Sequence, residues 1–305
     1  MNLQATIIFN SNAGGANRVD VPALERALHD AGYDPVSHAT ADETELDRAL
    51  DAASGLVVAI GGDGTLRATA LRLLGRDLPL TVLPLGTANN IARTFGVEGD
   101  PLKLASGLRD PHKRPLDVGV VRAPWGEQHF LEACGVGLYA DTLAAYDPEE
   151  GKSVQRALSA LSSTLGTYAP LDLHAKIDGR DASGGYFLFE ALNTTATGPR
   201  LRLAPSADPS DGLLDFVLVD ASERDSTLAY LRALLVGEFD ALPSVRTERG
   251  SSLDVGWNGS AWHVDGEVWP PRDTPLPLPS DEVRITVDVL PSALELFLPR
   301  VEVSV

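Results

Sequence analysis

The stretch GLVVAIGGDGTLRATALRLL, residues 55–74, contains a β-branched apolar run, a glycine-rich loop and a helical pattern in that order. This order is typical of a strand, a phosphate-binding loop and a helix, because glycine permits positive φ and close backbone approach, and helix N-terminal amides favour anions. The loop residues Gly61, Gly62 and Gly64 surround Asp63. No lysine follows as in a Walker A loop, and the Rossmann glycine spacing is absent. The carboxylate in this loop therefore needs an explanation.

Similar units surround this stretch and alternate apolar runs with helical patterns up to about residue 120. They comprise ATIIF (5–9) with a helix over 21–32, PVSHAT (35–40) with 43–53, and LTVLPLG (80–86) with 87–96. Successive βα units predict an open, doubly wound parallel sheet that binds ligands at the carboxyl ends of its strands. We expect residues 1–120 to form an α/β domain whose ligand binds at this edge.

The second half of the chain alternates apolar and polar residues with period two. In LDLHAKID (171–178) the residues Leu171, Leu173, Ala175 and Ile177 share one face, which predicts a half-buried antiparallel strand. Similar strands are expected at 128–137, 185–195, 213–220, 260–264 and 284–290, and helices at 154–165 and 227–239. We expect residues 121–305 to form a β-sandwich-like domain with a cleft against the first, and residues 290–305 to pack back on the first domain.

Composition narrows the classes of function. The chain has 305 residues, 44% of them hydrophobic, and a net charge of −18, which argues against a broad nucleic-acid footprint. Cys134 is the sole cysteine and the six histidines are scattered, so a cysteine zinc site is excluded. No apolar run approaches the ~20 residues that span a bilayer. We expect a cytoplasmic protein that contacts a membrane only transiently and peripherally, with a homodimer left open.

A second loop, PLGTANNIA (84–92), follows the next predicted strand and opens the next predicted helix. Thr87, Asn89 and Asn90 can donate to phosphate or ribose oxygens, although either asparagine could instead cap the helix. Two such loops in neighbouring units would place two groups of amides on one edge of the sheet.

These two loops resemble those of the diacylglycerol kinase catalytic domain family, which includes sphingosine kinases and soluble bacterial lipid kinases. The resemblance continues through GVGLYAD (135–141), APSADPSDGLLD (204–215), VDGE (264–267) and VLPSALELFLP (289–299). It implies a phosphofructokinase-like and NAD-kinase-like α/β domain followed by an antiparallel β-sandwich domain. Two positions depart from the family pattern: Asn90 stands where many relatives have Asp, and Tyr139 where an acidic residue is common.

The resemblance also implies an ATP site. The implied residues are Asn10, Thr40, Gly61, Gly62, Asp63, Gly64, Thr65, Leu66, Arg67, Gly86, Thr87 and Asn89. By itself Thr40 would be interpreted as a helix cap. Because Mg²⁺ can neutralise phosphate charge where lysine is missing, we interpret Asp63 as a catalytic carboxylate that orients a metal or its waters.

A magnesium site is implied on Asp211 and on the backbone carbonyls of Asp208 and Leu213, with Asp117 supporting the metal network. An all-oxygen set suits a hard cation. The alternatives are an ordinary Asp-Gly turn at Asp211 and a strand-end turn residue at Asp117.

Glu267 has two interpretations. The sequence WHVDGEVW (262–269) has the features of a two-residue hairpin with Asp265 and Gly266 in a type I′ turn, which requires no chemistry. The family instead places the general base on this glutamate. Both can hold, because a hairpin tip can present a carboxylate to a substrate.

We therefore expect an ATP- and Mg²⁺-dependent lipid kinase that transfers the γ-phosphate to a lipid hydroxyl, of diacylglycerol or a related lipid. One alternative is an NAD kinase-like enzyme, although the Asn-Glu motif that usually follows GGDG in that family is absent. The other is a non-catalytic kinase-like lipid-binding protein. The identity of the lipid stays open.

Overall fold

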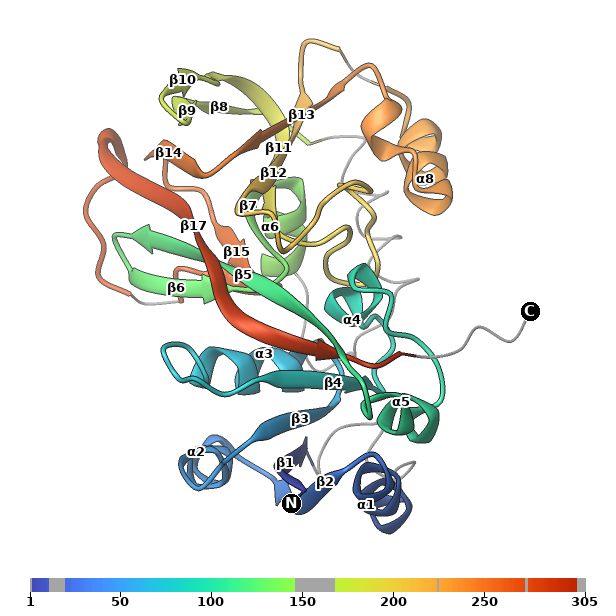
Figure 1. Cartoon of the computed structure of the whole chain (residues 1–305). Helices are drawn as coiled ribbons and strands as arrows, with labels where there is room; N and C mark the ends of the chain where they lie inside the picture. The colour runs from blue at the N-terminus through green and yellow to red at the C-terminus, as the bar shows by residue number, and fades with distance from the viewer. Residues whose placement is uncertain (1, 11–19, 146–167, 224, 272–273, 301–305) are drawn as a thin grey trace. The chain divides into compact units, whose positions relative to one another are not determined.

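The computed structural model describes residues 2–10, 20–145, 168–223, 225–271 and 274–300 (Figure 1). The loop expected after Asn10 and the helix expected at 154–165 lie outside the described residues. The chain divides into two compact units, unit 1 with Met1–Leu116 and Ser292–Val305, and unit 2 with Asp117–Pro291.

Unit 1 contains a parallel sheet with strand order β17–β4–β3–β1–β2, as the βα pattern predicts. Its strands are β1 (Leu3–Asn10), β2 (Tyr33–Thr40), β3 (Leu56–Gly61), β4 (Leu80–Pro84) and the last residues of β17 (Ser280–Leu298). Every residue of β3 is buried, as a central strand covered on both faces requires.

The helices of unit 1 cover this sheet. They are α1 (Val21–Asp30), α2 (Glu43–Asp51), α3 (Asp63–Arg72), α4 (Asn90–Thr94) and α5 (Pro101–Gly107). The chain runs outward from β1 to β2 and then crosses back to β3. Right-handed crossovers place α1 on one face and α2 and α3 on the other, and α2 packs against α3 while α1 packs against α5. The sheet is doubly wound, with its switch point between β1 and β3.

Unit 2 is an antiparallel sandwich of two sheets. One sheet has the order β13–β12–β11–β7–β15–β16 with β8 beside β11, and the other contains β10–β9–β14–β17. The strands are β5 (His112–Ala123), β6 (Gly126–Phe130), β7 (Ala133–Gly137), β8 (Leu171–Leu173), β9 (Ala175–Ile177), β10 (Arg180–Asp181), β11 (Gly184–Leu192), β12 (Leu214–Asp220), β13 (Val245–Gly250), β14 (Ser252–Trp257), β15 (Trp262–Val264) and β16 (Glu267–Trp269). The helices are α6 (Leu138–Ala144), α8 (Thr227–Val236) and the 3₁₀ turn η3 (Phe239–Ala241).

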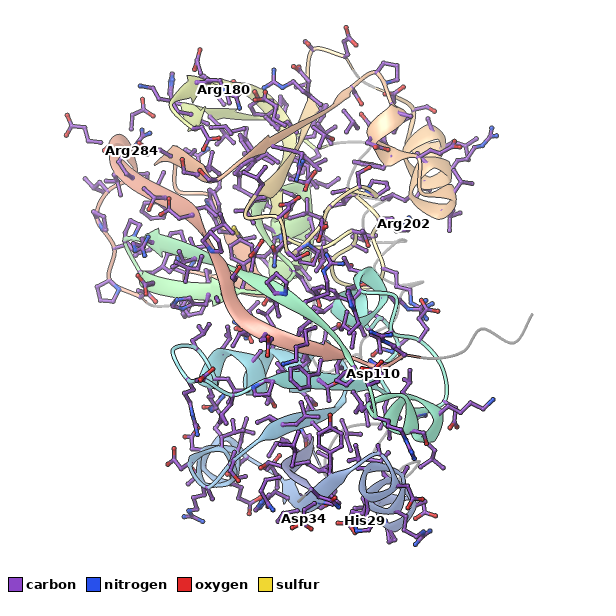
Figure 2. The ribbon with its side chains drawn as sticks, viewed as in Figure 1. His29, Asp34, Asp110, Arg180, Arg202 and Arg284 are labelled. Carbon is purple, nitrogen blue, oxygen red and sulfur yellow. The ribbon has the colours of Figure 1, made fainter. Side chains whose placement is uncertain are left out.

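The core of unit 2 lies between its two sheets. Phe216 and Phe189 of one sheet pack in the same apolar cluster as Val255 and Ile285 of the other. At its edge, Arg284 on β17, which Figure 2 labels, donates to Asp254 on β14 at 2.7 Å. The sequence prediction of an antiparallel sandwich-like second half is confirmed.

The prediction of one continuous strand over residues 171–178 is wrong in one respect. The chain breaks at His174, so that β8 pairs with β11 in one sheet and β9 pairs with β14 in the other. Leu173, Ala175 and Ile177 are nevertheless all buried, as the alternation predicts. A strand that passes from one layer to the other keeps its apolar face toward the core, and the sequence pattern alone does not reveal this change of partner.

Candidate functional site

The carboxyl ends of the parallel strands in unit 1 are level. Asn10 is paired with Thr40, Phe9 with Ile60, and Gly61 with Pro84. The glycine loop after β3 and the loop after β4 therefore leave the sheet at one edge, beside the switch point between β1 and β3. In doubly wound sheets this is where ligands bind.

The two loops touch through glycine. A Cβ on Gly86 would lie 2.6 Å from the Cα of Gly62, and a Cβ on Gly61 would lie 2.5 Å from the Thr65 Oγ1. Gly62 has a φ of −94°, so close approach and not positive φ is what this position requires. The left-handed residue is Asn89, with a φ of 52°. Gly64 is different, because a Cβ there would meet no atom within 4 Å.

Asp63 binds the second loop. Its carboxylate accepts the Ile91 backbone N–H at 3.4 Å, at the start of α4. Burial raises the pKa of Asp63, and hydrogen bonds from the backbone of Ile91, Asn89 and Asn90 oppose that rise. The same loop is braced by Asn89, whose amide donates to the Gly86 carbonyl at 2.8 Å. A carboxylate in the first loop therefore holds the second loop in place, whatever further role it has toward a metal.

The remaining residues predicted to bind the nucleotide differ in how exposed their side chains are. Thr40 is 5% exposed and donates to the Phe9 carbonyl at 3.4 Å. It does not cap α2, since Asp42 accepts the Glu45 N–H at that helix. Leu66 is 1% exposed and belongs to the core, so only its backbone faces the loop edge. Thr87 is exposed and Arg67 is half-buried.

In unit 2, the DG turn is organised by three aspartates, of which Asp117 is buried and Asp211 is exposed. Asp117 is 1% exposed, and its carboxylate accepts the Gly212 N–H at 2.7 Å while its own N–H donates to the Pro209 carbonyl at 2.7 Å. Asp211 accepts the Leu213 N–H at 3.0 Å and pairs with Arg249. Asp208 accepts both the backbone N–H and the hydroxyl of Ser210.

The sequence interpretation missed Asp215. This residue is 4% exposed on β12, with one carboxylate oxygen 4.0 Å from the Arg249 Nε. Burial raises its pKa to about 6, which Arg249 opposes and Asp211 reinforces. A strongly shifted carboxyl next to a predicted site is a signal of function. Its position within the quoted motif ADPSDGLLD was the available clue.

The donor chemistry at this turn fits a hard cation. The Asp211 carboxylate and the carbonyls of Asp208 and Leu213 offer oxygen only, which Mg²⁺ prefers. Among the described residues, no three His, Cys, Asp or Glu side chains are grouped as a ready metal cluster. The Arg249 guanidinium contacts the Asp211 carboxylate, so it would have to release this carboxylate to a metal.

Glu267 stands at the tip of a hairpin. Asp265 and Gly266 have φ values of 48° and 78°, and Val264 pairs with Glu267, so the turn is the expected type I′. Glu267 is exposed. Asp265 is anchored instead, because its carboxylate accepts the N–H groups of Leu131, Glu132 and Ala133 at 3.0, 2.8 and 3.2 Å. The turn presents one carboxylate to solvent and uses the other to hold a neighbouring loop.

Each half of the chain matches a known protein-family model. Residues 4–121 match the diacylglycerol kinase catalytic domain, and residues 135–298 match the YegS C-terminal NAD kinase beta sandwich-like domain. A diacylglycerol kinase of Mycobacterium tuberculosis strain H37Rv is 28% identical over 95% of this chain and 93% of its own length. A Pseudomonas syringae pv. tomato protein named "Probable lipid kinase YegS-like" is 32% identical over 83% of this chain and 79% of its own length.

A crystal structure of a candidate diacylglycerol kinase from Bacillus anthracis strain Sterne has the same fold. It aligns with a TM-score of 0.72 and 20% identity over 97% of this chain and 95% of its own. At this identity the likeness establishes the fold alone. Together, the two matched domains and the relative at 32% identity establish the family. The chain belongs to the family of diacylglycerol kinases and YegS-like lipid kinases.

Proposed function

We propose that this protein is an ATP- and Mg²⁺-dependent lipid kinase that transfers the γ-phosphate to a lipid hydroxyl. The observation that carries the proposal is the backbone contact between Gly62 and Gly86 at the carboxyl ends of β3 and β4. Two amide-bearing loops in contact beside the switch point of a doubly wound sheet form a surface suited to a polyphosphate.

The nucleotide would bind to unit 1. We assign phosphate contacts to the backbone of Gly61–Thr65 and to Thr87, which is exposed on the second loop. Asn10 and Thr40 end paired strands at the same edge and would lie on the nucleoside side. Asp63 keeps the two loops together and Asn89 braces the second loop, as their hydrogen bonds indicate. In an acidic protein these local amides would meet the negative charge of ATP.

Magnesium would be held by the Asp211 carboxylate and the carbonyls of Asp208 and Leu213. Asp117 would fix the turn through Gly212. When bound, Mg²⁺ supplies positive charge that stabilises the phosphates during transfer. Asp215 follows this turn on β12, where its carboxyl group has a raised pKa.

Glu267 would take the proton of the lipid hydroxyl. Its carboxylate is exposed on a short turn and is therefore accessible to a substrate. A general base must reach the proton that it removes, and a hairpin tip provides that access. The phosphate-side residues are the same for diacylglycerol, sphingoid bases and other lipid alcohols, so the acceptor is proposed only as a lipid with a free hydroxyl.

A membrane contact is proposed through α8. Leu228 and Leu235 on this helix are 75% and 76% exposed, and Val236 is 54% exposed, while Tyr230 and Ala233 face the core. Arg232 is exposed on the same outer face, so this face combines apolar side chains with one cation, a combination that suits a lipid surface. Within the described residues, no helix is both long and apolar enough to cross a bilayer.

The test is phosphate transfer from labelled ATP into a total lipid extract, with the product identified by mass. NAD⁺ serves as a parallel acceptor because the second domain matches an NAD kinase-like family model. We expect label in a phospholipid only when Mg²⁺ is present. Label in NADP⁺, or none in either acceptor, would reject the proposal.

A further inference from the structure

A carboxylate and an imidazole lie fully buried against each other, and the imidazole belongs to the hairpin that carries Glu267. Glu190 on β11 and His263 on β15 are both 0% exposed, and the Glu190 Oε2 lies 2.6 Å from the His263 Nε2. Neither residue belongs to the proposed nucleotide or metal sites. Ionisable groups are rarely buried so completely unless they are paired.

The strand register explains how they meet. Glu190 and His263 are both paired with Gly135, which lies on β7 between their strands. A Cβ at Gly135 would come within 2.4 Å of the Glu190 carboxyl carbon. The missing side chain on the middle strand therefore lets the outer two side chains touch across it.

The second nitrogen of His263 faces the turn. The Gly266 N–H is directed at the His263 Nδ1 at 3.4 Å, so this nitrogen acts as the acceptor. The ring proton then belongs on Nε2, where it is donated to the Glu190 carboxylate. Glu190 thus selects the tautomer, as a carboxylate partner commonly does for a functional histidine.

Other groups fix the ring and complete its surroundings. Tyr139 on α6 contacts His263 edge-to-face, with ring centroids 4.7 Å apart. Cys134 on β7, Glu132 and Asp265 in the turn are further titratable groups nearby, and burial together with the charges of Glu190 and Asp265 raises the pKa of the Cys134 thiol. The Glu190 Oε1 is buried without a hydrogen-bond partner in the described part of the chain.

Burying these two polar side chains lowers the stability of the folded protein relative to apolar packing. A buried carboxyl group with an unsatisfied oxygen lowers stability, and apolar side chains of similar volume can replace even buried ion pairs without loss. The turn is also anchored separately through Asp265, whose carboxylate accepts N–H groups from Leu131 to Ala133. Stability of the fold alone therefore does not account for the pair.

We propose that Glu190 and His263 are positioning residues that set the orientation of the Gly266 peptide and thereby the direction of Glu267. The inference rests on the proposed role of Glu267 as general base. Asp265 anchors one side of the turn and His263 the other. With both contacts in place, Glu267 projects from a turn whose backbone has little freedom, which preserves the geometry that proton transfer needs.

Two conservative variants separate the contacts. His263→Gln retains a terminal amide able to donate to Glu190 but removes the acceptor for the Gly266 N–H. Glu190→Gln retains size, and its amide can donate to the His263 Nε2, which would move the ring proton to Nδ1. We expect each to lower kcat about tenfold or more with the KM for ATP within about twofold, since the nucleotide loops are untouched. Glu282→Gln, an exposed glutamate on β17, is the matched control.

Two measurements do not depend on activity. Nitrogen NMR of the imidazole should show the Nε2–H tautomer in the wild type and its loss in Glu190→Gln. Hydrogen exchange at the Gly266 amide should become faster in His263→Gln. An Nδ1–H tautomer in the wild type would overturn the proposal even if the enzyme proves inactive on lipids.

A double-mutant cycle with Glu267→Gln completes the test. If the pair acts through Glu267, adding Glu190→Gln to Glu267→Gln should lower kcat no further, whereas independent effects multiply. Multiplying effects, or a kcat within about threefold of wild type in folded Glu190→Gln and His263→Gln, would reject the positioning role. If Glu267→Gln itself keeps its rate, the proposed base is wrong, and the tautomer and exchange results still judge the buried contact. Should Glu190→Gln fail to fold, His263→Gln decides, because Glu190 keeps a partner in it.

Discussion

At the residue scale, the glycine loop shows how a phosphate site can contain a carboxylate. Asp63 accepts the Ile91 N–H, and Gly62 and Gly86 are in backbone contact. The sequence predicted that both loops lie at one edge of the sheet, but not that they contact each other. That contact depends on tertiary packing of two loops that follow different strands, and a linear motif carries no information about it.

Glu267 is the residue whose substitution is most informative. Glu267→Gln preserves size but cannot accept the proton of the lipid hydroxyl, so we expect kcat to fall about 10²- to 10⁴-fold with ATP binding nearly unchanged. Stability should change by only a few tenths of a kcal/mol, because the side chain is exposed. Steady-state kinetics and ATP titration measure both effects.

The control for this experiment must be chosen from the structure. By sequence Asp265→Asn would be the natural control, as a conservative change in the same turn. Asp265 is unsuitable as a control, because its carboxylate accepts hydrogen bonds from three backbone N–H groups and its substitution would disturb the turn. Glu282→Gln on the exposed face of β17 replaces it. A near-wild-type rate for Glu267→Gln would remove this residue from the mechanism.

Asp211 tests the metal assignment. Asp211→Asn replaces one carboxylate of an all-oxygen set by a poorer ligand, so we expect loss of phosphate transfer and of any Mg²⁺-induced rise in melting temperature. Asp208→Asn should matter much less, because its proposed ligand is the backbone carbonyl and its side chain binds Ser210. Undiminished turnover by Asp211→Asn in chelator would contradict the assignment.

At the element scale, strands were easier to predict than their partners. The run Leu56–Ile60 became a fully buried central strand, and the alternation over 171–178 correctly placed Leu173 and Ile177 in the core. The break at His174 was not visible, because alternation specifies a face and not the strand on either side. The helix expected over 87–96 is shorter, since Asn89 enters the left-handed region just before α4 begins.

The turn between β15 and β16 offers a test of stability. Asp265→Asn removes the negative charge that faces three backbone N–H groups and leaves a single oxygen to accept them. We expect unfolding free energy to fall by about 1–3 kcal/mol, the usual cost of leaving buried donors unsatisfied. Chemical denaturation measures it, and a change as small as that of Glu282→Gln would show that these contacts contribute little.

Helix α8 offers a test of membrane contact. Replacing Leu228 and Leu235 by Ser removes two largely exposed apolar side chains without touching Tyr230 or Ala233 in the core. We expect weaker sedimentation with neutral vesicles and an unchanged melting temperature. Leu3→Ser, at an apolar residue that is 63% exposed in unit 1, is the control. Equal vesicle binding by both variants would exclude α8 as the contact.

At the scale of the whole molecule, net charge constrains how the protein reaches lipid. The chain carries 43 acidic and 25 basic residues. Many of its arginines are already paired on the surface, for example Arg122 with Glu127 and Asp288 at 2.8 Å each. Paired cations contribute little to attraction by an anionic surface, so binding should depend on apolar contact more than on charge.

We therefore expect that adding anionic lipid to neutral vesicles will not strongly increase binding in the absence of divalent cations. Like charges repel across the aqueous gap, and a polybasic segment that could reverse this locally is missing from the sequence. Raising the salt concentration should slightly strengthen binding to anionic vesicles, since it screens repulsion and leaves the apolar contact of α8 unaffected. Sedimentation at several salt concentrations makes the comparison, with the Leu228 and Leu235 variant in parallel. A large increase with anionic lipid that salt abolishes would instead reveal a basic surface, and the net charge would then be a poor guide to how this protein meets a membrane.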